Sequence, residues 1–340
     1  MTPPKIHFAL LLALWVGGLW ACRNTPDTAD PATASHKTPA LDAWADAPRQ
    51  RIEHWVAEVT QAGSPNFIPV ADRIAVFDND GTLWPEQPAP TQLVFALEWL
   101  RAQAPQHPEW AKDPLLKAAL DGDWKKLGDN HGAGLKKVMA VTHSGMSETA
   151  FHTAVRSWID TAVDERFNHL YKEVLYQPML ELLDYLRAHG FQTFIVSGGG
   201  ADFMRVWSEE AYGIPPYQVV GTYAGATYEV VGGKPVITKT AGEVFFDDKA
   251  AKPVAIHRFI GKVPVLCGGN SDGDQAMMQY TAGSPYKSLC VLLHHTDAER
   301  EYAYDLKTLS GHLESALTEA KEKNWLVVDM KNDFKRMFPF

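Results

Sequence analysis

Cysteine is scarce in this sequence of 340 residues, which holds three, at positions 22, 267 and 290. Cys267 and Cys290 each lie in an apolar run, and the spacing of the three fits no metal-binding motif. Because cysteine is among the most frequently buried residue types, we expect these two to be buried free thiols. A metal site built on cysteine is not predicted.

The sequence also lacks an excess of basic residues, with 32 Lys and Arg against 41 Asp and Glu. A formal net charge of −9 without basic runs argues against nucleic acid as the main partner. It also repels polyanions at long range, so any binding of phosphate must be local. Hydrophobic residues at 46% and charged residues at 21% are typical of a globular chain with a sizeable core.

The N-terminal apolar stretch is too short to be a spanning segment. Residues 6–21 follow Lys5 without a charge, whereas a membrane-spanning helix needs about 20 residues. The stretch fits the apolar region of a secretory signal. It ends in Leu19-Trp20-Ala21-Cys22, which resembles a bacterial lipoprotein cleavage and lipidation box, although Trp20 replaces the usual small residue. The alternative is an ordinary signal peptide in which Cys22 is incidental.

The lipoprotein resemblance implies that residues 1–21 are removed and that Cys22 becomes the lipidated first residue. The chain would then be exported and held on a bacterial membrane, facing the periplasm, with no spanning helix. Residues 22–46 contain mostly Thr, Pro, Ala, Asp and Ser, and are predicted to form a flexible linker. The folded part is expected to start near residue 47.

Apolar periodicity predicts strands that alternate with helices over the rest of the chain. A helical stripe covers residues 52–59, and Pro178 to Gly190 bound another predicted helix. The predicted strands are the apolar runs 74–77, 191–196, 263–267, 289–293 and 325–328. This alternation implies right-handed βαβ units and an α/β fold, a doubly wound parallel sheet with helices on both faces. Residues 90–177 show only helical patterns, so an all-helical insertion is expected.

Polar and acidic residues follow three of the predicted strands. The first strand ends in Asp78 and Asp80, the second in Ser197 and three glycines, and the third in Asn270, Asp272 and Asp274, with Lys249 and Lys252 between the last two. In such sheets, ligands bind at the carboxyl ends of the strands, so we expect these side chains to form one site.

These residue types are those of a phosphoryl-transfer site. Two carboxylates at positions i and i+2, such as Asp78 and Asp80, can flank one cation and one phosphate, and Mg²⁺ prefers oxygen ligands. One carboxylate can attack phosphorus, and the other can transfer the proton. A hydroxyl followed by glycines at a helix N-terminus supplies N–H donors for phosphate oxygens, and a lysine adds a compact positive charge.

The motif Asp78-Asn79-Asp80-Gly81-Thr82-Leu83 resembles the first motif of the haloacid dehalogenase superfamily. Ser197 resembles the second motif, and a lysine before residues 269–274 resembles the third and fourth. The motifs follow the family's order over residues 74–278, and their detail is most similar to the phosphoserine phosphatase-like branch.

The resemblance implies a role for each matching residue. Asp78 would be the nucleophile that becomes an aspartyl-phosphate and a ligand of Mg²⁺, and Asp80 the general acid and base, with its backbone carbonyl as a second ligand. Ser197 and the Gly198 amide would hold phosphate. Lys252 is the preferred third-motif lysine because it begins a helix, and Lys249 is the alternative.

The fourth motif departs from the family pattern. Asn270 stands where relatives have a carboxylate, so a neutral amide oxygen would ligate Mg²⁺. Asp274 would hold a metal-bound water, and Asp272 is the alternative ligand. Trp84 and Glu86 are expected to line the cleft below the insertion. His294 and His295 point to opposite faces of a strand, so a polar strand end is preferred over a metal site there.

The resemblance implies a core of residues 47–89 and 178–340, with residues 90–177 as a helical cap that closes over substrate. Asp80 argues against a dehalogenase, and an exported chain meets few sugar-phosphate intermediates. The expected activity is a Mg²⁺-dependent phosphomonoesterase acting on a small phosphoester outside the cytoplasm. The alternatives are a phosphomutase or phosphotransferase, and an inactive lipid-anchored protein that binds phosphoesters.

Overall fold

The computed structural model describes residues 39–308 and 310–340. The predicted signal peptide, Cys22 and most of the predicted linker lie outside these residues. In the part that is described, no helix has the length and apolar character needed to cross a membrane.

The centre of the fold is a six-stranded sheet with strand order β10-β9-β8-β1-β4-β5. Each neighbouring pair is parallel. The strands are β1 (Ile74–Phe77), β4 (Gln192–Gly200), β5 (Val219–Thr222), β8 (Leu266–Gly269), β9 (Leu289–His294) and β10 (Leu326–Asp329). The doubly wound α/β fold is therefore confirmed.

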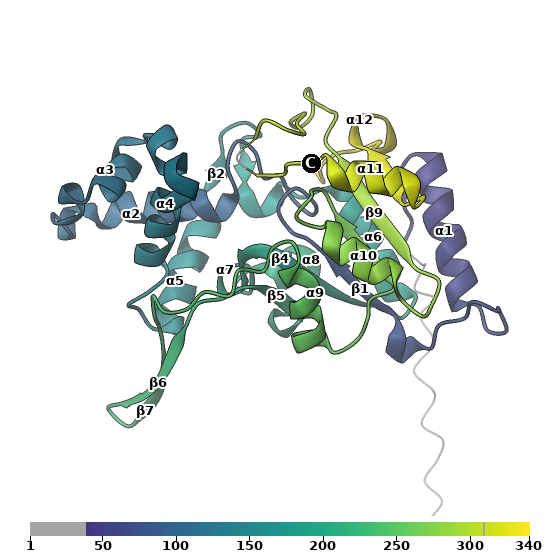
Figure 1. Cartoon of the computed structure of the whole chain (residues 1–340), viewed down its shortest axis with the longest axis horizontal. Helices are drawn as coiled ribbons and strands as arrows, with labels where there is room; N and C mark the ends of the chain where they lie inside the picture. The colour runs from purple at the N-terminus through teal and green to yellow at the C-terminus, as the bar shows by residue number, and fades with distance from the viewer. Residues whose placement is uncertain (1–38, 309) are drawn as a thin grey trace, which may run out of the picture. The chain divides into compact units, whose positions relative to one another are not determined.

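Helices cover both faces of this sheet (Figure 1). Alternate strand residues enter two separate core clusters: Phe77, Ile195 and Val291 enter one, and Val76, Val196 and Leu292 enter the other. This follows from the period of two in a strand. One face is covered by α1 (Asp46–Thr60), α6 (Gln177–Ala188), α7 (Ala201–Met204) and α8 (Ser208–Tyr212). The other face is covered by α9 (Ala251–Ala255), α10 (Gln275–Ala282) and α11 (Ser315–Glu322), and α12 (Met330–Asp333) follows β10.

The insertion between β1 and α6 contains α2 (Thr91–Gln103), α3 (Pro114–Asp121), α4 (Trp124–Thr142) and α5 (Glu148–Ile159). The first three pack together through their own apolar cluster, and they lie at one side of the sheet in Figure 1. Residues of α5 belong instead to the main core. A short antiparallel pair, β2 (Val163–Asp164) and β3 (His169–Leu170), also occurs here, so the expectation of a purely helical insertion was wrong in this detail.

Several predicted boundaries differ from the observed ones. Trp44 is fully buried in the main core, and its indole donates to the Pro178 carbonyl, so the linker predicted up to residue 46 ends earlier. The strand predicted at 191–196 continues to Gly200 because Ser197 and Gly200 still pair with β5. The strand predicted at 263–267 begins only at Leu266 and continues to Gly269.

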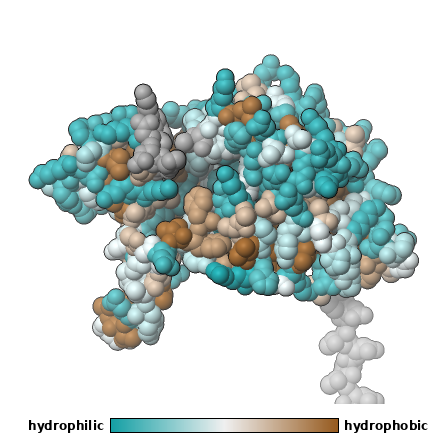
Figure 2. All heavy atoms as spheres, viewed as in Figure 1, coloured by the Kyte–Doolittle hydropathy of each residue, from teal (hydrophilic) through white to brown (hydrophobic). Residues whose placement is uncertain are grey.

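The sequence pattern predicted no helix or strand for residues 219–239. This segment contains β5 and a hairpin of β6 (Ala226–Val231) and β7 (Lys234–Lys239), which projects away from the sheet (Figure 1). Gly232 and Gly233 both have positive φ, which matches a two-residue hairpin turn and is a signal in the sequence. Figure 2 shows hydrophobic side chains at its tip, where Val230 and Val231 are exposed.

Candidate active site

The loop that follows β1 begins with Asp78 at the carboxyl edge of the sheet. The Asp78 amide donates to the Gly268 carbonyl of β8, so both strand ends hold this residue in place. Gly81 turns the chain with a φ of 74°. A Cβ at Gly81 would collide with Asn270 and Glu86, so only glycine lets the first motif approach the fourth so closely.

Lys252 joins the first, second and fourth motifs. Its Nζ donates to Asp78 Oδ1 at 2.8 Å, to Asp274 Oδ1 at 2.6 Å and to the Val196 carbonyl at 3.0 Å. Its side chain is 2% exposed. Burial alone would lower the pKa of Lys252, but Asp274 and Asp78 raise it above its usual value, so the ammonium stays charged.

The negative charge around Asp78 exceeds the single positive charge of Lys252. Burial, with the charges of Asp274 and Asp80, raises the pKa of Asp78 well above its usual value even though Lys252 opposes this. The site therefore holds three carboxylates against one buried ammonium, an excess of negative charge that a bound cation would offset.

Asp80 lies beside the glycines that end β4. Its Oδ1 accepts a hydrogen bond from Trp84 Nε1 at 2.7 Å, and its Oδ2 lies near Gly199. Burial raises the pKa of Asp80 to about 6, which places the carboxyl close to the range needed for proton transfer at neutral pH.

Ser197 is buried, and its Oγ accepts from the Gly199 amide at 3.1 Å. The Gly198 carbonyl accepts from Thr222 Oγ1 at 2.7 Å. The second motif thus lies next to Asp80 and Lys252, and the predicted residues Asp78, Asp80, Ser197, Gly198 and Lys252 meet at one edge of the sheet.

The fourth motif folds into a tight turn around Asp274. Asp274 Oδ2 accepts from the amides of Asn270 and Ser271 at 3.0 and 3.1 Å, while its Oδ1 accepts from Lys252. Both oxygens are therefore used by protein donors, and Asp274 fixes the turn and the lysine. Asn270 is buried, and its Oδ1 accepts from Thr82 Oγ1 at 3.2 Å.

Lys249 and Asp272, the alternatives for the phosphate lysine and the metal ligand, form no side-chain hydrogen bond with Asp78 or Lys252. Lys249 is exposed, and its amide donates to the Gly273 carbonyl. Asp272 Oδ1 accepts from the amides of Glu314 and Ala316, so this carboxylate caps the start of α11. Among described residues, Lys252 and not Lys249 reaches the carboxylates.

A hard cation fits the donors at this edge. Oxygen atoms are available from the Asp78 carboxylate, the Asp80 backbone carbonyl and the Asn270 amide, and the negative excess around Asp78 favours a positive ion. Within residues 39–308 and 310–340, no group of three or more His, Cys, Asp or Glu side chains is arranged to hold a metal. Carboxylate, carbonyl and amide oxygens are the kind of donor that Mg²⁺ binds.

The sequence predicted that Trp84 and Glu86 line the cleft, but both side chains are buried in the protein, so this prediction was wrong. The Trp84 ring is 1% exposed and stacks on Trp207 with ring centroids 4.3 Å apart. Glu86 is buried on the other side of the first motif, where its Oε1 accepts from Asn270 Nδ2 at 2.6 Å and Tyr304 OH at 2.8 Å. Burial raises the pKa of Glu86 to about 7.

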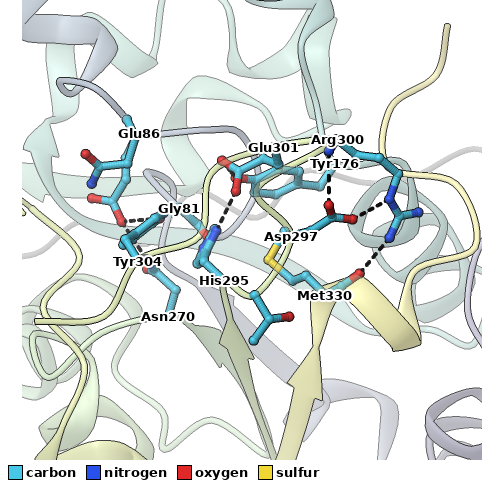
Figure 3. Close-up of polar contacts among 12 residues, drawn as sticks. Gly81, Glu86, Tyr176, Asn270, His295, Asp297, Arg300, Glu301, Tyr304 and Met330 are labelled. Atoms are coloured by element: carbon cyan, nitrogen blue, oxygen red, sulfur yellow. Dashed lines mark hydrogen bonds and ion pairs between the residues drawn. The ribbon is translucent and has the colours of Figure 1, made fainter.

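Residues after β9 add contacts that sequence reasoning missed (Figure 3). His295 is buried, with Nδ1 3.0 Å from Glu301 Oε2 and Nε2 2.8 Å from the Gly81 carbonyl. Both partners are acceptors, so both ring nitrogens carry hydrogen. Although burial favours the neutral ring, Glu301 raises the pKa of His295 above its usual value. The only signal in the sequence was the pair of histidines at a strand end.

A cavity of about 760 Å³ opens beside the second motif, between α4 and the segment after β7. Gly198 and Gly200 of the second motif are among the residues that line it. Much of the wall is apolar, from Leu135, Met139, Phe203, Val244 and Phe246.

The polar groups on this wall are partly satisfied by one another. Lys239 pairs with Asp202, and Gln92 Nε2 lies 2.9 Å from His143 Nε2. Burial lowers the pKa of His143 to about 3, so this ring is neutral at physiological pH.

Comparisons with known proteins agree with this geometry. A family model described as haloacid dehalogenase-like hydrolase matches residues 75–279. No curated protein matches the chain. Among solved structures, a conserved functionally unknown protein from Anaerococcus prevotii has 13% identity and a TM-score of 0.54, over 86% of this chain and 94% of its own.

Two further solved structures are less similar. A Bordetella pertussis protein of unknown function has 14% identity and a TM-score of 0.45, over 76% of this chain and 98% of its own. A phosphoserine phosphohydrolase-like protein from Francisella tularensis has 16% identity and a TM-score of 0.36, over 74% of this chain and 98% of its own. At these identities the likeness concerns the fold alone.

Proposed function

Because this chain belongs to the haloacid dehalogenase-like hydrolase family, we propose that it is a Mg²⁺-dependent phosphomonoesterase that works through an aspartyl-phosphate on Asp78. The observation that carries the proposal is that Asp78 is bound to a buried lysine while Asp80, two positions later, is held by Trp84 beside the glycines that end β4. Lys252 holds Asp78 at 2.8 Å, and Asp80 has a pKa of about 6. The second aspartate separates this site from a dehalogenase, as the family resemblance implies.

In the first step, a carboxylate oxygen of Asp78 forms a bond to phosphorus, and the bond to the leaving oxygen breaks. Asp80 donates its proton to that oxygen. In the second step, Asp80 takes a proton from water, the water oxygen attacks phosphorus, and phosphate leaves Asp78. Ser197 and the Gly198 amide would hold the phosphate oxygens, and the charge of Lys252 beside Asp78 would offset negative charge at the phosphoryl group. Mg²⁺, held by Asp78, the Asp80 carbonyl and Asn270, would supply further positive charge at the phosphoryl group.

We propose that the substrate is a small phosphoester whose organic part is largely apolar. The cavity beside Gly198 and Gly200 supports this, because its size is that of a small-molecule site and much of its wall is apolar. Its Lys239 is already paired with Asp202, which leaves less attraction for a charged amino-acid group.

The test is a panel of phosphomonoesters assayed for phosphate release with Mg²⁺ and with excess chelator. We expect turnover of p-nitrophenyl phosphate and 1-naphthyl phosphate, with kcat/KM at least about tenfold above that for phosphoserine or glycerol phosphate. Binding of phosphate without turnover of any ester would support the inactive binding protein instead. Turnover that favours phosphoserine would contradict the apolar substrate but not the phosphatase.

A change at Trp84 is expected to move the pH dependence. Asp80 must be protonated to act as the acid, so kcat/KM of the wild type should fall as pH rises through its pKa, about 6. The Trp84 indole lowers the pKa of Asp80 by donating to its carboxylate. In Trp84→Phe this donation is lost, so the fall in kcat/KM should move to higher pH.

The control for this change is Trp207→Phe. Trp207 stacks on the same ring, but its own Nε1 has no hydrogen-bond partner among the described residues. This variant also removes buried indole volume and should leave the pH profile in place. Equal pH profiles for both variants would show that Asp80 is not the titrating acid.

We propose further that the chain is an exported lipoprotein anchored through Cys22. The support is the apolar stretch of residues 6–21 followed by Leu19-Trp20-Ala21-Cys22. In a bacterial host, labelled palmitate should be incorporated into the wild type, and Cys22→Ala should lose the label and leave the membrane fraction. Equal labelling of both would reject the anchor.

A further inference from the structure

We propose that Glu86 orients the Asn270 amide toward the cation, so that a neutral side chain can serve where relatives are expected to use a carboxylate. In this role Glu86 is a positioning residue. The inference rests on the proposed cation site, since Asn270 is one of its oxygen donors.

The orientation follows from which atoms can donate. Glu86 Oε1 accepts from Asn270 Nδ2 at 2.6 Å and from Tyr304 OH at 2.8 Å, so this oxygen is an acceptor whether or not the other carboxyl oxygen carries a proton. The amide nitrogen must therefore face Glu86, which turns Oδ1 away from it. Thr82 Oγ1 donates to this Oδ1 at 3.2 Å, which agrees with the same orientation. Without Glu86, the amide could rotate by 180° and present its N–H₂ to a cation, which would repel it.

Glu86 is itself held rigidly. It is 3% exposed, and Tyr304 OH donates to the same oxygen at 2.8 Å (Figure 3). Tyr304 stacks on His295 with ring centroids 4.3 Å apart, and His295 bonds to the Gly81 carbonyl at 2.8 Å. The chain after β9 thus supports both Glu86 and the turn of the first motif. Groups that orient metal ligands in this way commonly change metal affinity by about 10–100-fold when replaced.

The first test measures metal binding without turnover. Mn²⁺ binding to the full chain is followed by electron paramagnetic resonance, and Mg²⁺ binding by competition. We expect Kd for Mn²⁺ to rise by about tenfold or more in Glu86→Ala, and by less in Glu86→Gln, whose amide oxygen can still accept from Asn270. The matched control is Glu181→Ala, because Glu181 is another largely buried carboxylate, which accepts from the Ala43 amide and from Gln177 Nε2. A Kd for Glu86→Ala within about twofold of the wild type would overturn the proposal.

The second test exchanges donor and acceptor and is read in the absence of metal. Asn270→Asp alone would place two carboxylates 2.6 Å apart, so Tm in chelator should fall by roughly 3 °C or more. Adding Glu86→Gln supplies an amide donor opposite the new carboxylate at position 270, so the double variant should recover most of that loss. If the losses of the two single variants simply add, Glu86 and residue 270 are not coupled, and the proposal fails.

The two tests separate this inference from the proposed function. A wild type that binds neither Mn²⁺ nor Mg²⁺ would reject the metal-dependent phosphatase, whereas the melting experiment would still report whether Glu86 and Asn270 are coupled. A wild type that hydrolyses esters together with unaffected Glu86 variants would reject only the role of Glu86.

Discussion

Replacing Asp78 by asparagine is expected to lower kcat for p-nitrophenyl phosphate by at least about 10⁴-fold while the protein stays folded. The amide cannot form the aspartyl-phosphate, because its nitrogen and oxygen lack the charge and nucleophilicity of the carboxylate. Steady-state phosphate release at saturating Mg²⁺ measures this. Residual turnover within tenfold of the wild type would show that another group attacks phosphorus.

Asp78→Asn should not lower the thermal stability of the protein, so a loss of activity in this variant can be assigned to the chemistry and not to unfolding. The pKa of Asp78 is raised by burial and by Asp274 and Asp80, so the folded state favours the neutral form of this group. A carboxyl whose pKa is higher in the folded state than in the unfolded state stabilises the fold at low pH. This stabilisation is lost as the pH rises from the pKa of the unfolded state through the pKa of the folded state. A neutral isostere avoids that loss, so Tm in chelator at pH 7 should equal or exceed that of the wild type.

Asp272→Asn is the matched control within the fourth motif. Asp272 caps α11 through the amides of Glu314 and Ala316 and does not contact Lys252 or Asp78. We expect activity within about threefold of the wild type and little change in stability, because asparagine caps a helix about as well as aspartate does. A loss of activity comparable to that of Asp78→Asn would show that Asp272 belongs to the metal site and would contradict the arrangement described above.

Replacing Lys252 by methionine is the second change with a large expected effect. Methionine has a similar length but no charge, so Asp78 and Asp274 would both be buried without their ammonium partner. Removing one partner from a buried ion pair destabilises a protein by about 3–5 kcal/mol. Loss of the positive charge that lies 2.8 Å from Asp78, the proposed nucleophile, should also lower kcat by about 10²–10³-fold.

The stability of Lys252→Met should depend on pH in a definite direction. Lys252 opposes the raised pKa of Asp78, so without the ammonium this pKa rises further and Asp78 binds a proton more readily in the folded state than in the unfolded state. The destabilisation relative to wild type should therefore be small at pH 4 and increase toward pH 8. Urea unfolding at several pH values measures it.

Lys249→Met is the control for this second change. Lys249 is exposed and lies three positions earlier in the chain, and the sequence left it as the alternative phosphate lysine. We expect no more than about 0.5 kcal/mol of stability change and nearly unchanged kcat. A large effect at Lys249 with a small one at Lys252 would reject the assignment of the buried lysine.

The sequence by itself determined the class of fold and the position of the site. The apolar run 74–77 became β1, and the runs 289–293 and 325–328 became strands within one residue of their predicted ends. Most residues of these runs are buried whichever face of the sheet they are on, so an unbroken apolar run along the chain is enough to indicate a strand. For the same reason the sequence correctly placed Asp78 and Asp80 at a strand end, whereas their chemical roles are still predictions.

The tertiary structure decided which of several similar residues reach the site. Lys252 and Lys249 have the same chemistry, and so do Asp274 and Asp272, but only one of each pair turns toward Asp78. Glu86 and His295 carried no recognisable pattern, because their partners Asn270 and Gly81 lie 184 and 214 positions away in the chain. Contacts over such separations depend on how strands are ordered in the sheet. Neither the spacing nor the composition of the sequence records that order.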